Sequence, residues 1–425
     1  MKILVVGSGG REHALVWKLY QSERVERIFV APGNDGMAEL AEIVNIKSND
    51  IKGLADWAEE NGIDLTVVGP EEPLVNGIVD EFESRGLRIF GPDKKAARIE
   101  GSKVFAKSIL KKYNIPTAEF EVFTTFEEAL AYLKQAEYPL VIKAEGLAAG
   151  KGVFIATDKE KACQAVEKIM EKRIFGDAGQ RIVVEDFLEG EEVSVLALTD
   201  GKTIIPMVPA QDHKPVFDGD EGPNTGGMGA YSPVPFVGSD LQHEVYENIL
   251  EPTVRALNKE GIKYKGILYA GLILTDSGPK VLEFNARFGD PETQVIIPRL
   301  KTDLVDLIDA VIDEKLEGKR LDWDDRAAVC VVLASGGYPF DYDTGYRIKG
   351  LEQLAQYDNF LIFHAGTKME DGHFVTDGGR VMGITVLGNG LIDAINQVYQ
   401  AVEDIYFEDM HYRTDIGYKA IVDDY

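Results

Sequence analysis

The sequence has few of the features that would place the protein in a membrane, in an oxidising compartment or on nucleic acid. Two cysteines, Cys163 and Cys330, form no metal or disulfide pattern. No apolar run reaches the length of a membrane span, and the first residues, MKILVVG, predict a strand and a glycine turn rather than a signal segment. Basic residues are in the minority, with 45 Lys and Arg against 72 Asp and Glu and a formal net charge of −27. We therefore expect a cytoplasmic protein that binds neither nucleic acid nor membranes and holds anionic ligands with a few placed cations and amides.

The length of 425 residues predicts two to four domains. In residues 1–101, apolar runs alternate with polar helical stretches; the runs are KILVVG, RIFVAP, DLTVVGP and LRIFGP, and the helices are REHALVWKLYQS, DIKGLADWAEENG and PLVNGIVDEFESRG. This alternation predicts a doubly wound α/β domain with ligands beyond the carboxyl ends of its strands.

Residues 102–320 predict a second domain, of α+β type. After a helix over SKVFAKSILKKYN, a smaller lid of about 118–190 has strands FEVF, PLVIKAE, GVFIAT and RIVVEDFL, and helices near 126–135 and 158–172. Antiparallel hairpins follow at 192–210 and 266–288, separated by a glycine-rich loop at 218–233 that we expect to be functional. After a helix at 303–315, AAVCVVLASGG opens a small β-rich domain at 325–425. The predicted fold class is multidomain α/β and α+β.

The loop VGSGGREH follows the first predicted strand and opens a helix, where a phosphate would meet free amides. The pattern runs Gly7, Gly9 and then Glu12, so the third glycine of a dinucleotide site is missing, and no acidic residue ends the second strand. A phosphate anchor made by Gly9, Gly10 and Arg11 fits better than a nicotinamide site. A tight turn without a ligand is the alternative.

Two further loops are candidates for nucleotide binding. VIKAEGLAAGKGV (141–153) is no Walker loop, because Gly150-Lys151 is followed by Gly152; we expect a flap over a triphosphate with Lys143 on a phosphate oxygen, or else a plain flexible hairpin. In VVEDFLEGEEVSV (183–195), backbone groups at 186 and 188 suit an adenine edge and Glu192 suits ribose hydroxyls. A solvated acidic turn is the alternative there.

The stretch VLEFNARFGDPETQ (281–294) alternates in a way that predicts a strand with two different faces. Leu282, Phe284, Ala286 and Phe288 would pack on one face, while Glu283, Asn285 and Arg287 line the other. An exposed polar strand face is the alternative interpretation of these three residues.

Four motifs in order, VVGSGGREHAL, QDHK (211–214), GPNTGGMGAYSP (222–233) and RFGDPETQ (287–294), resemble the ATP-grasp superfamily and, within it, the phosphoribosylamine–glycine ligase family of purine biosynthesis. The resemblance covers essentially the whole chain. It implies a ligase that joins glycine to 5-phosphoribosylamine through glycyl phosphate, giving glycinamide ribonucleotide, ADP and phosphate. No enzyme nucleophile is needed, and the sequence has no G-x-S-x-G elbow and no cysteine motif.

The resemblance also implies site residues. Arg287 would stabilise the transferring phosphoryl group, and Glu283 and Asn285 would hold Mg²⁺, with Mn²⁺ as the other ion considered. Gly271 stands where many ATP-grasp enzymes carry another acid, so the number of metal ions stays open. ATP would be held by Lys103, Lys143, Gly146, Gly150, Lys151, Gly152, Glu185, Asp186, Phe187, Leu188 and Glu192. Glycine and phosphoribosylamine would be held by Gly9, Gly10, Arg11, Glu71, Asp212, Lys214, Thr225, Gly226 and Gly227.

Other interpretations remain at this point. His13 and His213 lie inside motifs, and we expect them to pack rather than to act in catalysis. The rival functions are a nicotinamide-dependent oxidoreductase, a non-catalytic nucleotide sensor, and another ATP-grasp ligase or carboxylase of purine metabolism. We expect a monomer or a weak homodimer.

Overall fold

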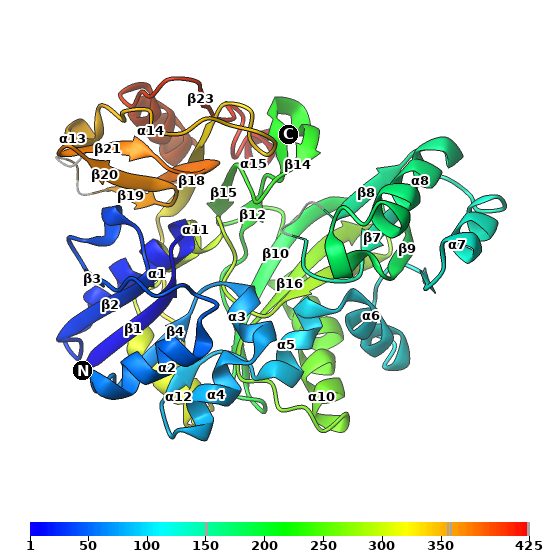
Figure 1. The fold of residues 1–425 in the computed structure, drawn as a ribbon, viewed down its shortest axis with the longest axis horizontal. Helices are drawn as coiled ribbons and strands as arrows, with labels where there is room; N and C mark the ends of the chain where they lie inside the picture. The colour runs from blue at the N-terminus through cyan, green and yellow to red at the C-terminus, as the bar shows by residue number, and fades with distance from the viewer. Residues whose placement is uncertain (149–151, 355–356, 358, 423–425) are drawn as a thin grey trace.

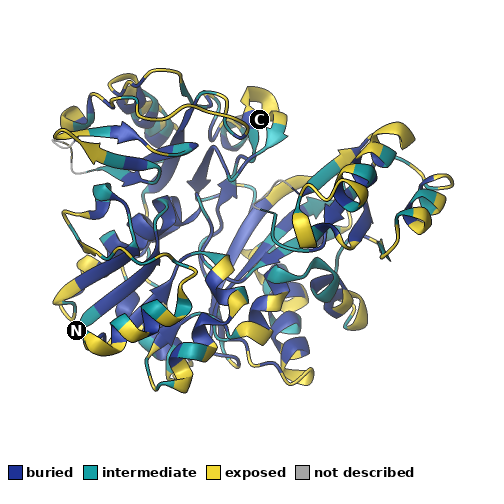
Figure 2. Cartoon of the chain, in the orientation of Figure 1, coloured by how far each residue is buried: buried dark blue, intermediate teal, exposed yellow. Residues whose placement is uncertain are grey.

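The computed structural model describes residues 1–148, 152–354, 357 and 359–422 of the chain (Figure 1). Within these residues no helix is both long and apolar enough to cross a membrane. Figure 2 shows the buried residues gathered in the sheets and the exposed residues on the outer helices and loops. Gly150 and Lys151, two of the predicted ATP-binding residues, lie outside the described residues.

The N-terminal sheet is parallel and has the strand order β3-β2-β1-β4-β5, which confirms the doubly wound prediction. Its strands are β1 (Lys2–Gly7), β2 (Arg27–Pro32), β3 (Glu42–Ile43), β4 (Leu65–Val68) and β5 (Ile89–Phe90). Its helices are α1 (Gly10–Tyr20), η1 (Asp35–Met37), α2 (Ile51–Glu60), α3 (Glu71–Asn76), α4 (Ile78–Ser84) and α5 (Lys94–Gly101). The sequence missed α5 and the short strand β3. Its single helix over PLVNGIVDEFESRG is two helices, because Gly77 takes a φ of 94° between them.

The two faces of this sheet are covered by helices from different parts of the chain. On one face, Leu4 and Val6 pack with Leu54 of α2 and Phe82 of α4. On the other, residues of β1 and β2 pack with α1 and with α12 (Leu304–Ile312), a helix some 300 residues further along the sequence. The N-terminal core is therefore completed by a distant segment.

The central part has two antiparallel sheets. The lid sheet, at the right of Figure 1, has the order β6-β9-β7-β8, and the second has the order β11-β10-β16-β17. The lid contains β6 (Phe120–Phe123), α7 (Phe126–Leu133), β7 (Leu140–Ala144), β8 (Val153–Ala156), α8 (Lys159–Val166), η2 (Glu167–Glu171), η3 (Gly176–Gly179) and β9 (Ile182–Asp186). The rest comprises α6 (Lys103–Lys112), β10 (Glu191–Thr199), β11 (Ile204–Pro206), α9 (Ser239–Val245), η5 (Tyr246–Leu250), α10 (Glu251–Lys259), β16 (Gly266–Thr275), β17 (Gly278–Asn285), α11 (Thr293–Ile296) and η6 (Ile297–Arg299). Both hairpins and the lid strands are confirmed, whereas the helices α9 and α10 were not anticipated.

Strand β17 contains a bulge that the alternation in the sequence did not reveal. Its register with β16 shifts between Gly271, which pairs with Glu283, and Leu272, which pairs with Val281, so Leu282 is the extra residue. Val281, Phe284 and Ala286 belong to the core, while Leu282 is only partly buried. The prediction that Leu282 packs with Phe284 was wrong, because the bulge changes the face on which the strand resumes.

The C-terminal sheet draws strands from two separated segments. Its order is β12-β15-β18-β22-β19, with β23 also paired to β18. The segment expected to be a long loop at 218–233 instead contains β14 and β15, because β15 finds its partner β18 about a hundred residues later. The elements are β12 (Gln211–Asp212), β13 (Pro215–Phe217), η4 (Asp218–Asp220), β14 (Glu221–Asn224), β15 (Gly229–Ser232), β18 (Ala327–Ser335), α13 (Leu351–Leu354), β19 (Phe360–His364), β20 (Thr367–Glu370), β21 (His373–Thr376), β22 (Arg380–Gly388), α14 (Leu391–Glu403), β23 (Met410–His411) and α15 (Lys419–Val422). The division at 1–101, 102–320 and 325–425 stays a prediction, and β15 and α12 both pack across it.

Candidate active site

Arg287 lies just beyond the end of β17 and is held by two carboxylates from the N-terminal part. Its Nε is 3.2 Å from Glu71 Oε2 and its Nη2 is 3.0 Å from Glu100 Oε1. Burial raises the pKa of Glu100 to about 7, against the opposing charge of Arg287. Burial also opposes the charge of Arg287, but Glu100 and Glu71 raise the pKa of the guanidinium, so it stays protonated. The predicted catalytic arginine thus meets Glu71, which the sequence assigned to substrate binding, and Glu100, which sequence reasoning missed.

The core residues of β17 lie on one face of the strand, and Glu283 and Asn285 lie on the opposite face. Both are half-buried. Among the described residues, neither side chain forms a hydrogen bond or a close ion pair. Lys103 is close enough to Glu283 that, while burial lowers the pKa of Lys103, Glu283 partly restores it. Glu283 and Asn285 therefore share one face of the strand, as the alternation in the sequence predicted, and Glu283 lies near Lys103.

Lys107, Lys143 and Glu185 form a buried cluster between α6, β7 and β9, and the partly buried Lys103 lies close enough to feel the charge of Lys143. Lys143 Nζ is 3.1 Å from Glu185 Oε2 and donates to the carbonyl of Leu282 at 3.1 Å, which the bulge makes available. Lys107 Nζ is 2.8 Å from the same oxygen of Glu185. The other oxygen of Glu185 is buried and has no hydrogen-bond partner among the described residues.

Lys107 was missed by sequence reasoning, although the sequence carries a signal for it. It stands four residues after Lys103 on α6, so the two side chains share one helix face. Burial lowers the pKa of Lys107 to about 8, against the attraction of Glu185. A cationic surface made by three lysines suits the phosphates of a nucleotide.

The base of the predicted flap is fastened to α6. Lys103 Nζ donates to the carbonyl of Gly146 at 3.1 Å, and the hydroxyl of Ser102 donates to the carboxylate of Glu145. The second carboxylate oxygen of Glu145 is buried without a partner in the described part of the chain. Gly152, at the far end of the flap, is buried. The Gly146 end of the flap therefore lies beside Lys103.

The adenine and ribose groups predicted from the sequence lie at the end of β9 and the start of β10. The amide of Asp186 already donates to the carbonyl of Glu119 at 3.0 Å. Phe187 is half-buried, and the amide of Leu188 has no partner among the described residues. Of the two backbone donors at 186 and 188, only the one at 188 is available to a base.

A second charged cluster joins residues predicted for different ligands. Lys214 Nζ is 2.7 Å from Glu192 Oε2 and 3.2 Å from Asp212 Oδ1. Burial raises the pKa of Asp212 to about 7, while Lys214 opposes the shift. Thr225 fixes this strand, because its amide and hydroxyl both donate to the carbonyl of Lys214 at 2.8 Å. The predicted ribose contact and the predicted glycine contacts therefore share one ion-pair network.

Arg380 of β22 connects the C-terminal sheet to this region and was not predicted. Its Nη2 is 3.2 Å from Asp290 Oδ2, and its Nη1 donates to the carbonyls of Gly226, Gly227 and Asp290. Burial opposes its charge, but Asp290 raises its pKa. No local pattern in β22 marks Arg380, so only the fold reveals that it supports the Gly226-Gly227 turn.

In the first glycine loop, Glu12 occupies the position of the missing third glycine. Its carboxylate accepts hydrogen bonds from the amide of Gly9 and from Nε of Arg11, both at 2.6 Å. A Cβ atom at Gly7 would lie 2.5 Å from Glu12 Cγ, and one at Gly69 would lie 2.0 Å from Glu12 Oε1. The glycines thus enclose a carboxylate where a pyrophosphate would approach, which disfavours the nicotinamide alternative.

Arg11 connects this loop to Arg287. Its Nη1 donates to the carbonyl of Phe288 at 3.1 Å, and Nη1 of Arg287 donates to the same oxygen at 3.3 Å. Burial opposes the charge of Asp290, but Arg380 and Arg11 lower the pKa of its carboxylate. Nη2 of Arg11 has no partner within the described residues. Gly10 is packed against Gln294, whose Nε2 would be 2.7 Å from a Cβ at Gly10.

The two histidines inside motifs are buried. His13 accepts a hydrogen bond at Nδ1 from the amide of His364 at 2.9 Å, and burial lowers its pKa to about 3. His213 has no hydrogen-bond partner for either ring nitrogen in the described residues, and burial lowers its pKa to about 4. Both rings are therefore neutral at ordinary pH and packed in the interior.

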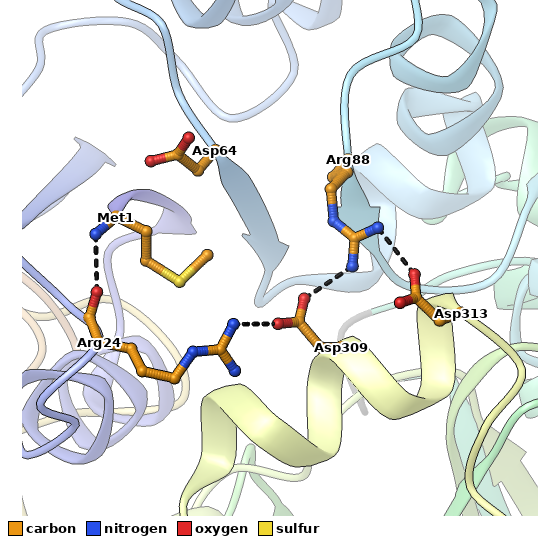
Figure 3. Close-up of a pocket in the computed structure, with 6 residues that line it drawn as sticks. All are labelled: Met1, Arg24, Asp64, Arg88, Asp309 and Asp313. Atoms are coloured by element: carbon orange, nitrogen blue, oxygen red, sulfur yellow. Dashed lines mark hydrogen bonds and ion pairs between the residues drawn. The ribbon is translucent and has the colours of Figure 1, made fainter.

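An open pocket of about 530 Å³ lies far from these groups, at the amino ends of the N-terminal strands (Figure 3). It is lined by Met1, Arg24, Asp64, Arg88, Asp309 and Asp313. Figure 3 shows Asp309 between the two arginines, with hydrogen bonds of 2.6 Å to Arg24 and 2.7 Å to Arg88. None of the residues predicted to bind substrates lines it.

Models of the three domains of phosphoribosylglycinamide synthetase match this chain: the N domain at residues 1–100, the ATP-grasp (A) domain at residues 101–293 and the C domain at residues 328–419. The chain is 54% identical over 417 residues to phosphoribosylamine–glycine ligase of Caldanaerobacter subterraneus subsp. tengcongensis, with 98% of this chain and 99% of that protein covered.

Two solved structures resemble the fold. Phosphoribosylamine–glycine ligase from Thermotoga maritima has a TM-score of 0.85 at 34% identity, covering 98% of this chain and 100% of that one. The biotin carboxylase domain of the Hydrogenobacter thermophilus 2-oxoglutarate carboxylase, in complex with MgADP, ADP and bicarbonate, has a TM-score of 0.75 at 16% identity, covering 96% and 91%. The second likeness indicates a shared fold alone.

Proposed function

Because the chain belongs to the phosphoribosylglycinamide synthetase family, we infer that it is an ATP-dependent ligase of purine biosynthesis that joins glycine to 5-phosphoribosylamine. The products are glycinamide ribonucleotide, ADP and phosphate. We further propose the division of roles among its residues that follows, a cytoplasmic location, and a monomer or weak homodimer in solution.

ATP is assigned to the space between the lid and β17. Lys103, Lys107 and Lys143 offer cations to its phosphates, the amide of Leu188 offers a donor to the base, and Glu192 accepts from the ribose. The carboxylate of Glu185 neutralises two of the lysines and holds them in place. The flap, Gly146 to Gly152 with Gly150 and Lys151, closes the space in this assignment.

The donor chemistry of Glu283 and Asn285 fits Mg²⁺, which binds through few protein oxygens and keeps phosphate and water ligands. Their side chains are free of other partners among the described residues, and two ligands suffice for a metal that also binds phosphates. When bound there, Mg²⁺ would neutralise charge on the phosphate oxygens; Mn²⁺ is the alternative ion. Glu283 lies close enough to Lys103 to raise the pKa of that lysine against the effect of burial.

The reaction then needs two kinds of help from the protein. Phosphorylation of glycine brings anionic oxygens together, and Arg287 offers a fixed cation beside Glu283 for that charge. Glycine is assigned to Asp212, Lys214 and the turn of Thr225, Gly226 and Gly227. The second step, attack of the ribosylamine nitrogen on glycyl phosphate, needs mainly proximity, because the amine is already a nucleophile.

Phosphoribosylamine is assigned to the N-terminal side of Arg287. Gly10 and Nη2 of Arg11 face the ribose 5-phosphate, and Glu71 faces the sugar or amine. The amide of Gly9, which the sequence assigned to the same phosphate, is instead engaged with Glu12. Since Nε and Nη1 of Arg11 are engaged with Glu12 and Phe288, the guanidinium offers a fixed donor rather than a mobile one.

The observation that carries this assignment is the junction at Arg287. Acids from the N-terminal part hold it just beyond the end of β17, the strand that carries the two proposed metal ligands, and its Nη1 shares the carbonyl of Phe288 with Arg11. The acceptor and the activated glycine would meet there. The test is ADP formation that requires glycine and freshly prepared 5-phosphoribosylamine together. ADP formation without the amine, or ATP-dependent use of bicarbonate, would favour a different ligase or a carboxylase.

A further inference from the structure

Asn34 joins three separate segments around the first glycine loop with one side chain. It follows β2 and is buried. Its Nδ2 donates to the carbonyl of Ser8 at 2.7 Å and to the carbonyl of His364 at 3.0 Å. Its Oδ1 accepts from the amide of Gly36 at 2.9 Å. The side-chain amide of Asn34 therefore donates two hydrogen bonds through Nδ2 and accepts one at Oδ1.

The bond to Ser8 fixes the orientation of a peptide in the glycine loop. In a planar trans peptide, the carbonyl of Ser8 and the amide of Gly9 point in opposite directions. Asn34 holds the carbonyl on one side and the carboxylate of Glu12 holds the amide of Gly9 on the other, at 2.6 Å. This peptide lies immediately before Gly10 and Arg11, so its orientation determines where their amides point.

The bond to His364 extends the same support to the C-terminal sheet. His364 ends β19, and its amide donates to Nδ1 of His13 on α1 at 2.9 Å. A Cβ atom at Gly36 would lie 2.1 Å from Cγ of His364, so the turn after β2 and this histidine are in direct contact. Strand β19 thus touches the loop through Asn34 and the following helix through His13.

We propose that Asn34 is a positioning residue for phosphoribosylamine, through which β19 of the C-terminal part holds the phosphate-binding loop in shape without touching the substrate. The inference rests on the assignment of the ribose 5-phosphate to Gly10 and Arg11. It gives the C-terminal part a role in recognising the acceptor substrate.

If Asn34 only stabilised the fold, its variants would change the KM values in a different pattern. Loss of the Asn34 amide leaves the carbonyls of Ser8 and His364 without their donor, and this lowers stability in either case. A general loss of structure affects the KM values of all three substrates. A displaced phosphate loop raises the KM for phosphoribosylamine alone, since the ATP and glycine groups lie on other elements.

The experiment compares Asn34→Asp and Asn34→Ala with wild type, measuring the KM for each substrate and the Tm. Asn34→Asp keeps the size and the acceptor for Gly36 but replaces the donor by an oxygen. The matched control is Asn61→Asp, because Asn61 also donates from Nδ2 to a backbone carbonyl, that of Trp57 at 2.9 Å, at the opposite end of the same sheet. Gly36→Ala is a second variant, which displaces His364 without altering the amide of Asn34.

Both Asn34 variants and Gly36→Ala should raise the KM for phosphoribosylamine about tenfold or more, the equivalent of about 1.4 kcal/mol. The KM values for ATP and glycine should stay within about twofold, and Asn61→Asp should change none of the three. A parallel rise in all three KM values, or a lowered Tm with unchanged KM, would overturn the proposal. If Arg11→Ala also leaves the KM for phosphoribosylamine unchanged, the phosphate assignment itself fails; if Arg11→Ala raises it and the Asn34 variants do not, only the positioning role fails.

Discussion

Two networks of arginines and carboxylates flank the N-terminal sheet, one at each end of its strands. At the carboxyl ends, Arg11 and Arg287 meet Glu12, Glu71 and Glu100; the Arg287 side chain is 16% exposed and that of Glu100 is 6% exposed. At the amino ends, Arg24 and Arg88 meet Asp306, Asp309 and Asp313, and the two arginines are 44% and 40% exposed.

The two networks have the same chemistry but a different origin of their pKa shifts. Burial is the largest influence on the pKa of Glu100, which it raises to about 7. In the outer network, the hydrogen bond between Arg88 and Asp313 is the largest cause of the pKa shifts. It raises the pKa of Arg88 and lowers the pKa of Asp313. The outer network also lines the open pocket of Figure 3. Burial of charged groups therefore marks the end of this sheet where we propose the reaction occurs, whereas the open pocket lies at the other end.

The strongest test of this comparison lies on β17 and beside it. Arg287→Lys keeps the charge but loses the rigid fork between Glu71 and Glu100, and we expect kcat to fall on the order of 100-fold. Glu283→Gln removes the charge of a proposed metal ligand, so raised Mg²⁺ should partly restore its activity. Glycine-dependent ADP formation is measured across a Mg²⁺ titration. An equal response of both variants to Mg²⁺, or full activity in either, would show that the roles are divided differently.

The next test concerns the second arginine of the inner network. Arg11→Ala removes the donor proposed for the ribose 5-phosphate and its bond to Phe288. The KM for phosphoribosylamine should rise about tenfold or more, about 1.4 kcal/mol, with little change in the KM for ATP. Arg24→Ala is the matched control from the outer network. Equal effects on the two substrates would count against the assignment.

A third prediction uses the buried carboxylate directly. The pKa of Glu100 is raised from 4.5 to about 7, so its stabilising contribution is complete below pH 4.5 and is lost as the pH rises through about 7. Glu100→Gln does not titrate. Its free energy of unfolding relative to wild type should therefore increase between about pH 5 and about pH 8, by roughly 2 kcal/mol. Urea unfolding at several pH values measures this, and a difference that stays constant or falls with pH would contradict the buried state of the carboxylate.

The smallest effects are expected in the outer network. Arg24→Ala and Arg88→Ala remove exposed ion pairs, which are worth less than about 1 kcal/mol each. Their Tm values should approach that of wild type in about 1 M salt, where the screening length is near 3 Å. Neither kcat nor any KM should change by more than about twofold. A large loss of activity would mean that the ion pairs of Arg24 and Arg88 do more than attach α12 to the N-terminal sheet.

The sequence predicted much of the fold and most of the candidate site, and its failures have physical causes. Motifs that are local, such as the strand of Glu283, Asn285 and Arg287, were recognisable because side-chain alternation is set within the segment. The bulge at Leu282 was not, because it depends on pairing with β16. Arg380 was missed because its partners lie about 90 and 150 residues earlier in the chain.

Other features had a signal that was interpreted incompletely. Lys107 follows Lys103 at helical spacing, so its place beside the same ligand was recognisable. Glu12 was noticed only as the absence of a third glycine, whereas its carboxylate holds the loop together. Asn34 lies in a turn of ordinary composition, and nothing local indicates that it bonds to His364, 330 residues away.

The position of α12 has a consequence for synthesis on the ribosome. Ile3, Val5 and Val30 lie on the sheet face that is completed by Leu304 and Ile308. At about 5–20 residues per second, the roughly 300 residues between them take on the order of 15 to 60 seconds to make. During that time the first strands are already outside the ribosome with part of their apolar face bare. We therefore expect the nascent N-terminal part to keep this apolar face exposed until α12 emerges.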